Sequence, residues 1–255
     1  MSSDIALAVI GGTGLYKLAA LEQVETLAGD TVYGAPSGPV RVGQLAGMRV
    51  AFMARHGEDH SIPPHRVNYR ANLRRLLDLG ATRVLAINTV GGITHRFPPR
   101  TLACPDQIID YTWGRTTTIW DEAGGKPLHV DFTEPYSVGF RHELVAAAAK
   151  AGVGIVDGGC YGAVQGPRLE SWAEIIRMRR DGCDLVGMTG MPEAGLAREL
   201  GVDYACLAVI ANWAAGCGTG NSGQPAPEIT MDEVLANVEA ASAPLPRLLQ
   251  ALLEA

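Results

Sequence analysis

The 255-residue chain has few charged residues, no paired cysteine motif and no long apolar run. Charged side chains make up 19% of the sequence and apolar ones 47%, which excludes a disordered chain and predicts a compact globule with a large buried core. The net charge of -6 excludes a general electrostatic attraction to nucleic acid or to anionic membranes. We therefore expect no nucleic-acid partner and no membrane partner, and an anionic substrate would need a local binding site.

The sequence also lacks the signatures of metal binding and secretion. Its five cysteines are odd in number, widely spaced and without a CxxC pair, which is typical of reduced cytoplasmic thiols. The histidines show no HExxH or similar spacing, so we assign no metal. The first residues contain one short apolar run without a preceding basic segment, unlike a signal peptide, and no run reaches the ~18 residues of a membrane span. We expect a cytoplasmic protein.

Short apolar runs alternate with helical patterns along the chain. Runs rich in Val, Ile, Leu and Ala predict buried strands at 5–10, 50–54, 84–87, 185–188 and 204–211. Helical periodicity is found at 67–79, 141–151, 170–180, 192–200 and 231–253, the last opened by Thr230 with Glu233 three residues on. This alternation predicts an α/β chain with a mostly parallel, wound sheet, and we interpret residues 1–255 as a single domain. The glycine- and proline-rich stretch 211–229 is expected to form a loop.

Polar residues and glycines follow each predicted strand. Ligands of wound sheets bind beyond the carboxyl ends of the strands, so these residues are candidates for one site. Gly11–Gly14, with Thr13, could hold an anion on backbone N–H groups or could be a tight turn; the dinucleotide pattern GxGxxG is absent because Lys17 stands at its third glycine. The planar fork of Arg55 suits phosphate oxygens, and His56 could donate a further hydrogen bond.

Each of these residues also has an ordinary structural explanation. Arg55 could form a salt bridge and His56 could be a satisfied histidine. Thr89 and Thr189 follow strands, where a hydroxyl serves either a ligand or a turn. Met188 and Leu169 could pack on a flat base and a ribose, or could belong to the core.

Five motifs in this order resemble those of the methylthioadenosine and purine nucleoside phosphorylases: GGTGLY (11–16), ARHG (54–57), VNYRANL (67–73), GPRLES (166–171) and MTGMPE (188–193). The resemblance implies a nucleoside phosphorylase fold with a central mixed sheet flanked by helices. It implies cleavage of a purine nucleoside by inorganic phosphate as co-substrate, without a metal or an organic cofactor. It also implies a homotrimer in which neighbouring subunits border each other's sites.

The resemblance also assigns roles to individual residues. The residues implied at the phosphate site are Thr13, Arg55, His56, Thr89, Val90 and Thr189. Met188 is implied as a ribose contact, and Leu169 stands where the family often has an aromatic residue on the base, so it keeps an apolar wall but weakens stacking. His129 resembles the family residue near the 5′ end of a neighbouring subunit's nucleoside, although it could be an ordinary surface histidine.

The segment after the last predicted strand departs from the pattern of enzymes that act on methylthioadenosine. Those enzymes carry Asp-x-Asp, whereas this chain has Asn212, Trp213 and Ala214. An amide NH₂ can serve the 6-oxo group and N7 of hypoxanthine, and Ala214 removes the acceptor for a 6-amino group. We therefore expect a 6-oxopurine, with Asn212 and His56 as the catalytic residues; alternatively, Asn212 only bonds its own backbone.

At the 5′ end, Met231 and Leu235 lie four residues apart at the start of the last helix. An apolar pocket there favours a methylthio group over a hydroxyl, since burial of the methylthio group contributes roughly 1–2 kcal/mol. The expected substrate is S-methyl-5′-thioinosine, although both side chains could be core residues. The alternatives are a methylthioadenosine phosphorylase, a general inosine and guanosine phosphorylase, a nucleoside or anion sensor, and a Rossmann-type nucleotide-binding module.

Overall fold

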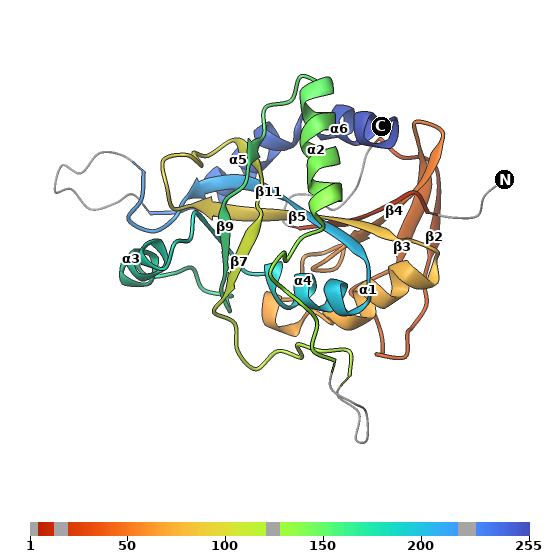
Figure 1. The fold of residues 1–255 in the computed structure, drawn as a ribbon, viewed down its shortest axis with the longest axis horizontal. Coiled ribbons are helices and arrows are strands. Elements are labelled where there is room, and N and C mark those ends of the chain that lie inside the picture. Colours follow the sequence, from red (N-terminus) through yellow and green to blue (C-terminus); the bar gives the residue numbers. More distant parts are fainter. Residues whose placement is uncertain (1–4, 13–19, 121–127, 219–227) are drawn as a thin grey trace.

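The structure is a computed structural model that describes residues 5–12, 20–120, 128–218 and 228–255 (Figure 1). A mixed sheet forms its centre. In Figure 1, α2 and α6 cover one face of this sheet, and α1 and α4 cover the other. This arrangement confirms the fold class expected from the sequence.

Strands and helices alternate along much of the chain. The strands are β1 (Leu7–Gly11), β2 (Glu22–Leu27), β3 (Val40–Leu45), β4 (Met48–Ala54), β5 (Arg83–Gly92), β6 (Thr101–Cys104), β7 (Gln107–Asp110), β8 (Val156–Asp157), β9 (Cys160–Ala163), β10 (Leu185–Gly187) and β11 (Asp203–Trp213). The helices are α1 (Tyr69–Asp78), α2 (Val138–Lys150), α3 (Trp172–Arg180), α4 (Gly190–Glu199), α5 (Met231–Ser242) and α6 (Leu245–Leu253), with a 3₁₀ turn η1 (Pro64–Arg66).

The sheet branches at β5. One edge of β5 pairs in parallel with β11 along the length of the strand. The other edge pairs in parallel with β1 at residues 84–87 and antiparallel with β10 at residues 91–92. Between these two stretches, no strand among the described residues pairs with that edge at 88–90. The branch therefore opens a gap in the sheet beside Thr89 and Val90.

Each of the five predicted strands is present, but the sheet is less parallel than the alternation suggested. β10 runs antiparallel to β5, and β2, β3 and β4 form an antiparallel meander. β2 was not predicted because its side chains are almost all exposed and include two glutamates, so it has no apolar run. β5 and β11 also continue past their apolar runs, so Thr89 and Asn212 lie within strands instead of after them.

The helices follow the predicted pattern, and α1, α3 and α5 begin with a side-chain cap. Asn68 accepts from the backbone N of Ala71 at 3.2 Å, and Thr230 accepts from that of Glu233 at 3.3 Å. The predicted segment 231–253 is divided into α5 and α6 because Pro244 lacks the N–H that a continuous helix needs. The expected loop 211–229 begins with the end of β11, and its residues 219–227 lie outside the described part of the chain.

Side chains of the strands alternate between two apolar layers. Ala8 and Ile10 of β1 belong to one hydrophobic cluster, together with Leu73 of α1, whereas Leu7 and Val9 belong to the other, which α2, α5 and α6 complete. The strands on both sides of the gap beside β5 are thus packed between two apolar layers. Among the described helices, none combines the length and apolar character that a bilayer crossing requires.

Candidate active site

A cavity of about 520 Å³ opens at the gap beside β5. The chain segments that line it are far apart in sequence: the turn after β1, the segment after β4, the middle of β5, the segment before α3, the β10–α4 connection, the end of β11 and the start of α5. The predicted site residues among its lining residues are Arg55, His56, Thr89, Val90, Leu169, Met188, Thr189, Asn212 and Met231. The structure therefore brings together nine residues that the sequence singled out.

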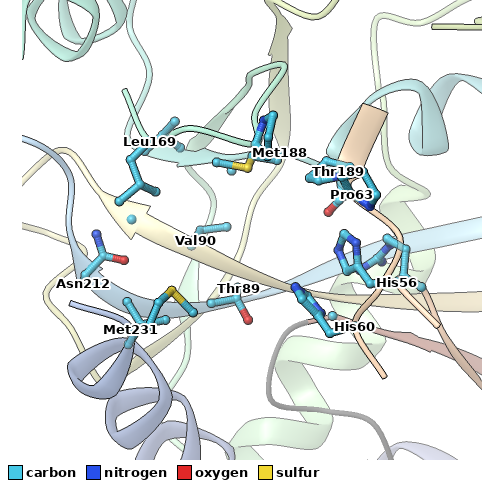
Figure 2. A pocket seen from close by; sticks show the side chains of 18 of the residues that line it. His56, His60, Pro63, Thr89, Val90, Leu169, Met188, Thr189, Asn212 and Met231 are labelled. Carbon is cyan, nitrogen blue, oxygen red and sulfur yellow. The ribbon is translucent and has the colours of Figure 1, made fainter. Parts of the chain in front are cut away.

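Figure 2 shows how these side chains divide the cavity. His56, His60 and Thr189 lie toward one end, and Leu169, Asn212 and Met231 lie toward the other, with Thr89, Met188 and Val90 between the two groups (Figure 2). The end with the two histidines is thus polar, while the other combines an apolar wall with the amide of Asn212 and the carboxyl group of Glu170, next to Leu169.

Four predicted substrate contacts do not line the cavity. Ala214 is 2% exposed, and its N–H donates to the carbonyl oxygen of Gly92 at 2.8 Å. The ring of Trp213 meets His95 edge to face with centroids 6.0 Å apart. Leu235 and His129 are exposed elsewhere on the chain. Thr13 lies outside the described residues, so its role stays a prediction.

Arg55 is fully buried and paired with Glu193 of α4. Nε and Nη2 of Arg55 donate to the two Glu193 carboxylate oxygens at 2.8 and 2.9 Å, and Nη2 also donates to Oδ1 of Asn88 at 3.0 Å. Burial opposes the charged form of Arg55, but the Glu193 carboxylate raises the pKa of Arg55 above its ordinary value. The two guanidinium nitrogens of Arg55 expected to bind phosphate are therefore bonded to Glu193 instead. The third nitrogen, Nη1, donates to the carbonyl oxygen of Ile87 and remains near the cavity, beside Gly12.

His56 is held as a neutral imidazole. Its Nδ1 lies 2.8 Å from the carbonyl oxygen of Ile62, which can only accept, so Nδ1 carries the proton. Burial, followed by the nearby charge of Arg55, lowers the pKa of His56 to about 4. At neutral pH its Nε2 is therefore an acceptor, suited to a protonated phosphate oxygen, whereas the sequence had suggested a donor.

Glycines let the cavity walls approach one another at two positions. A Cβ at Gly166 would lie 2.5 Å from Sδ of Met188, and the φ of +60° at Gly166 also favours glycine. A Cβ at Gly91 would lie 3.3 Å from Nδ2 of Asn212. The GPRLES motif thus makes room for Met188, and β5 makes room for Asn212.

Asn212 enters the cavity at an irregularity of β11. The β5 register shifts between Ile210 and Asn212, which then faces Gly91. Its Nδ2 donates to the carbonyl oxygen of Trp213 at 2.7 Å, the backbone bond considered as an alternative from the sequence. Since an amide carries two N–H groups, one donor remains for a ligand.

Two carboxylates that matter at this site were not predicted. Glu193 ends the MTGMPE motif, and the need of a buried arginine for a counter-charge was the signal that could have identified it. Glu170 lines the cavity next to Leu169, and burial raises the pKa of its carboxyl group. Its position next to Leu169, the residue expected to form an apolar wall against the base, was the signal that could have identified Glu170. Within the described ranges, no group of three His, Cys, Asp or Glu side chains is placed to bind a metal.

Comparison with known proteins identifies the family. Residues 6–254 match the phosphorylase superfamily, to which the chain therefore belongs. It is 68% identical to the probable S-methyl-5′-thioinosine phosphorylase of Xanthomonas campestris over 97% of both chains. It is 42% identical to the 6-oxopurine nucleoside phosphorylase of Pyrococcus furiosus, with 82% of this chain and 80% of that protein covered.

The fold comparison agrees with the family match. Methylthioadenosine phosphorylase from Schistosoma mansoni in complex with adenine superimposes with a TM-score of 0.91 at 27% identity, covering 98% of this chain and 91% of that one. The resemblance stated from the five motifs is thus confirmed, and so is the expected enzyme class, a purine nucleoside phosphorylase type of pentosyltransferase.

Replacing Glu193 by Gln should destabilise the protein strongly. The Arg55 charge would stay buried without its partner, which costs roughly 3–5 kcal/mol of the free energy of unfolding. Urea unfolding at one protein concentration measures this loss. Glu143→Gln, which breaks an exposed ion pair with Arg83, is the control and should cost less than about 1 kcal/mol. Equal losses for the two variants would contradict this account of the pair.

The depressed pKa of His56 predicts a loss of stability in acid. The unfolded chain binds a proton at His56 below the ordinary pKa of 6.5, while the folded chain does so only near 4. Stability therefore falls as pH decreases through this window, by roughly 2–3 kcal/mol at pH 4.5 relative to pH 7.5. His56→Asn keeps a donor for Ile62 and should lack this component, so urea unfolding of both proteins across the window isolates it. Parallel pH profiles would refute the assignment.

Proposed function

We propose that the protein cleaves S-methyl-5′-thioinosine with inorganic phosphate, giving hypoxanthine and 5-methylthioribose 1-phosphate. The observation that carries this proposal is the division of one cavity into a polar end with His56 and Thr189, a middle with Thr89, and an end where Asn212 and Glu170 stand beside an apolar wall. A tetrahedral anion and a purine nucleoside would lie side by side there. The name of the Xanthomonas campestris relative supports the same substrate.

In the proposed reaction, phosphate attacks the anomeric carbon while the C–N bond breaks and the ribosyl group gains oxocarbenium character. We assign phosphate binding to Thr13, Arg55, His56, Thr89, Val90 and Thr189. The phosphate charge stabilises the ribosyl cation, and Asn212 stabilises the purine as it leaves with the electron pair of the C–N bond. Solvent supplies the proton that the departing purine takes up, so catalysis rests on positioning and electrostatics. Neutral His56 would accept a hydrogen bond from the protonated phosphate oxygen.

The base end favours a 6-oxopurine over adenine. A 6-oxopurine presents N1–H as a donor and O6 and N7 as acceptors, whereas adenine presents N1 as an acceptor and a 6-amino donor. The remaining N–H of Asn212 can serve O6 or N7, and the carboxylate of Glu170 can accept from N1–H. With adenine, the same carboxylate would face a lone pair. Asn212 and Glu170 therefore both favour a 6-oxopurine over adenine.

The 5′ end of the nucleoside would lie against the start of α5. Met231, which is 58% exposed, and Val234 line the cavity there, and both are apolar. They are three residues apart on one helix face, so they form a short apolar strip. Such a strip suits a methylthio group, because a 5′-hydroxyl would lose its hydrogen bonds to water.

The assembly and location stay as expected from the sequence. We propose a cytoplasmic homotrimer of single-domain chains, in which residues 1–255 form one phosphorylase domain and a neighbouring subunit brings His129 to the nucleoside. Trp113, Trp120 and Leu128 are exposed apolar side chains that an interface between copies would cover. The extent of the family match, 6–254, supports one domain.

Substrate profiling with and without phosphate tests the proposed function. Methylthioinosine should give hypoxanthine and a sugar 1-phosphate only when phosphate is present, and its kcat/KM should exceed that of methylthioadenosine by about 100-fold. Inosine and guanosine distinguish the second candidate, a general 6-oxopurine nucleoside phosphorylase, which the name of the Pyrococcus furiosus relative favours. Base release without phosphate, or no turnover of any of the four nucleosides, would exclude the proposal.

Glu170→Ala should change base selection. Loss of the acceptor for N1–H should lower kcat/KM for methylthioinosine by about 10-fold to 100-fold, while that for methylthioadenosine stays constant or rises. Initial rates on both nucleosides give this ratio. Glu143→Ala, an exposed change on α2, is the control. An unchanged ratio in Glu170→Ala would show that this carboxylate does not select the base.

A further inference from the structure

Arg115 uses every N–H of its guanidinium group on other parts of the chain. Nε donates to Oε1 of Gln165 at 3.1 Å, and Nη2 donates to the carbonyl oxygens of Val164 and Gln165 at 3.2 and 2.8 Å. Nη1 donates to the carbonyl oxygens of Met188 and Met191 at 2.8 and 2.6 Å. Arg115 itself does not line the cavity. Its contacts are therefore to the segments that build the cavity walls.

These contacts join the two ends of the cavity. Val164 and Gln165 lead directly into residues 166–170, which carry Leu169 and Glu170 at the base end. Met188 and Met191 stand on either side of Thr189 in the sequence, and Thr189 lies at the end of the cavity proposed for phosphate. One planar group thus fixes the spacing between the base wall and the phosphate wall. The guanidinium group of Arg115 also lies over the ring of Tyr69 on α1, with its carbon 5.8 Å from the ring centroid.

Arg115 also differs from Arg55 in its charge balance. The charge of Arg55 is neutralised by Glu193, with which it forms a bidentate ion pair. Arg115, in contrast, makes no ion pair within the part of the chain that the structure describes; its acceptors are carbonyl oxygens, an amide oxygen and the hydroxyl of Tyr69. Its charge reaches the phosphate end, because it is among the causes that lower the pKa of His56.

A phosphate ion that enters a cavity loses much of its hydration, and a neutral pair does little to replace it. An arginine whose partners are dipoles keeps its full charge available to a nearby anion. We propose that Arg115 is a positioning residue that holds the Met188–Thr189 segment against the 165–170 segment and supplies the uncompensated positive charge for phosphate binding. This proposal rests on the proposed function, since it concerns the same cavity.

Two substitutions separate positioning from charge. Arg115→Ala removes both, and the KM for phosphate should rise by about 10-fold while kcat/KM falls by about 100-fold. Arg115→Lys keeps the charge but cannot reach both segments, so the KM for phosphate should stay within about 3-fold of the wild type while kcat falls by about 10-fold. Added guanidinium at about 10 mM should recover about a tenth of the lost activity of Arg115→Ala, whereas the same concentration of sodium chloride should not.

Arg141→Ala is the matched control. Arg141 is also an arginine that donates to backbone carbonyls, those of Cys104 and Pro105, but neither of these residues lines the cavity. Its loss should lower stability and leave the KM for phosphate and the KM for the nucleoside unchanged, and added guanidinium should have no effect. Folded Arg115→Ala with unchanged kinetic constants, or with losses that Arg141→Ala reproduces, would overturn the proposal. If Arg115→Ala does not fold, unchanged kcat in Arg115→Lys would overturn it.

A binding measurement keeps this proposal separate from the proposed function. Inorganic phosphate should raise the melting temperature of the wild type and of Arg115→Lys, and the shift should be lost in Arg115→Ala. If the wild type binds phosphate but turns over no nucleoside, the proposed function fails while the phosphate shift still decides the role of Arg115. An equal shift in wild type and Arg115→Ala, or none in the wild type, contradicts the charge assigned to Arg115.

Discussion

The arrangement of the polar end of the cavity, where we propose that phosphate binds, depends on the buried ion pair between Arg55 and Glu193. This pair joins the end of β4 to α4, and the hydroxyl of Tyr204 on β11 donates to the same carboxylate at 2.9 Å. An isolated charge at this depth would be far more costly than the paired one, so the three segments are stable only together. The ion pair therefore ties together the segments that wall this end of the cavity.

The branching of β5 determines where this preformed region lies. A sheet with continuous pairing on both edges of β5 would place strands where the cavity is. Because β10 joins the strand from the opposite direction, Met188 and Thr189 are carried back toward the end of β1 and face Thr89. The close approach of Met188 and Thr189 to Thr89 is thus a result of strand direction, and the irregularity of β11 then turns Asn212 into the same space.

Apolar runs predicted the inner strands well, because strands buried on both faces leave a continuous apolar signature. The same reasoning placed Arg55 and Thr189 at one site, since residues after buried strands meet at one edge. It did not reveal the direction of β10 or the exposed strand β2, because neither depends on a local pattern. Arg115 had no signature at all: its acceptors are mostly backbone carbonyls, which every residue carries. His129 was implied for a site shared between subunits, where a single chain holds no information about contact. Leu235 was predicted from its spacing to Met231, but Val234 is the residue that lines the cavity beside Met231.

Two glycines beside the cavity lower the stability of β5. Gly91 and Gly92 lie in a central strand, where glycine loses much conformational entropy on folding and contributes no side chain to packing. A Cβ at Gly92 would collide with the carbonyl group of Phe97, and one at Gly91 would press on Asn212. β-Branched residues, which would stabilise an ordinary strand, therefore cannot be accommodated at these positions. β5 remains a weaker central strand beside an open binding site.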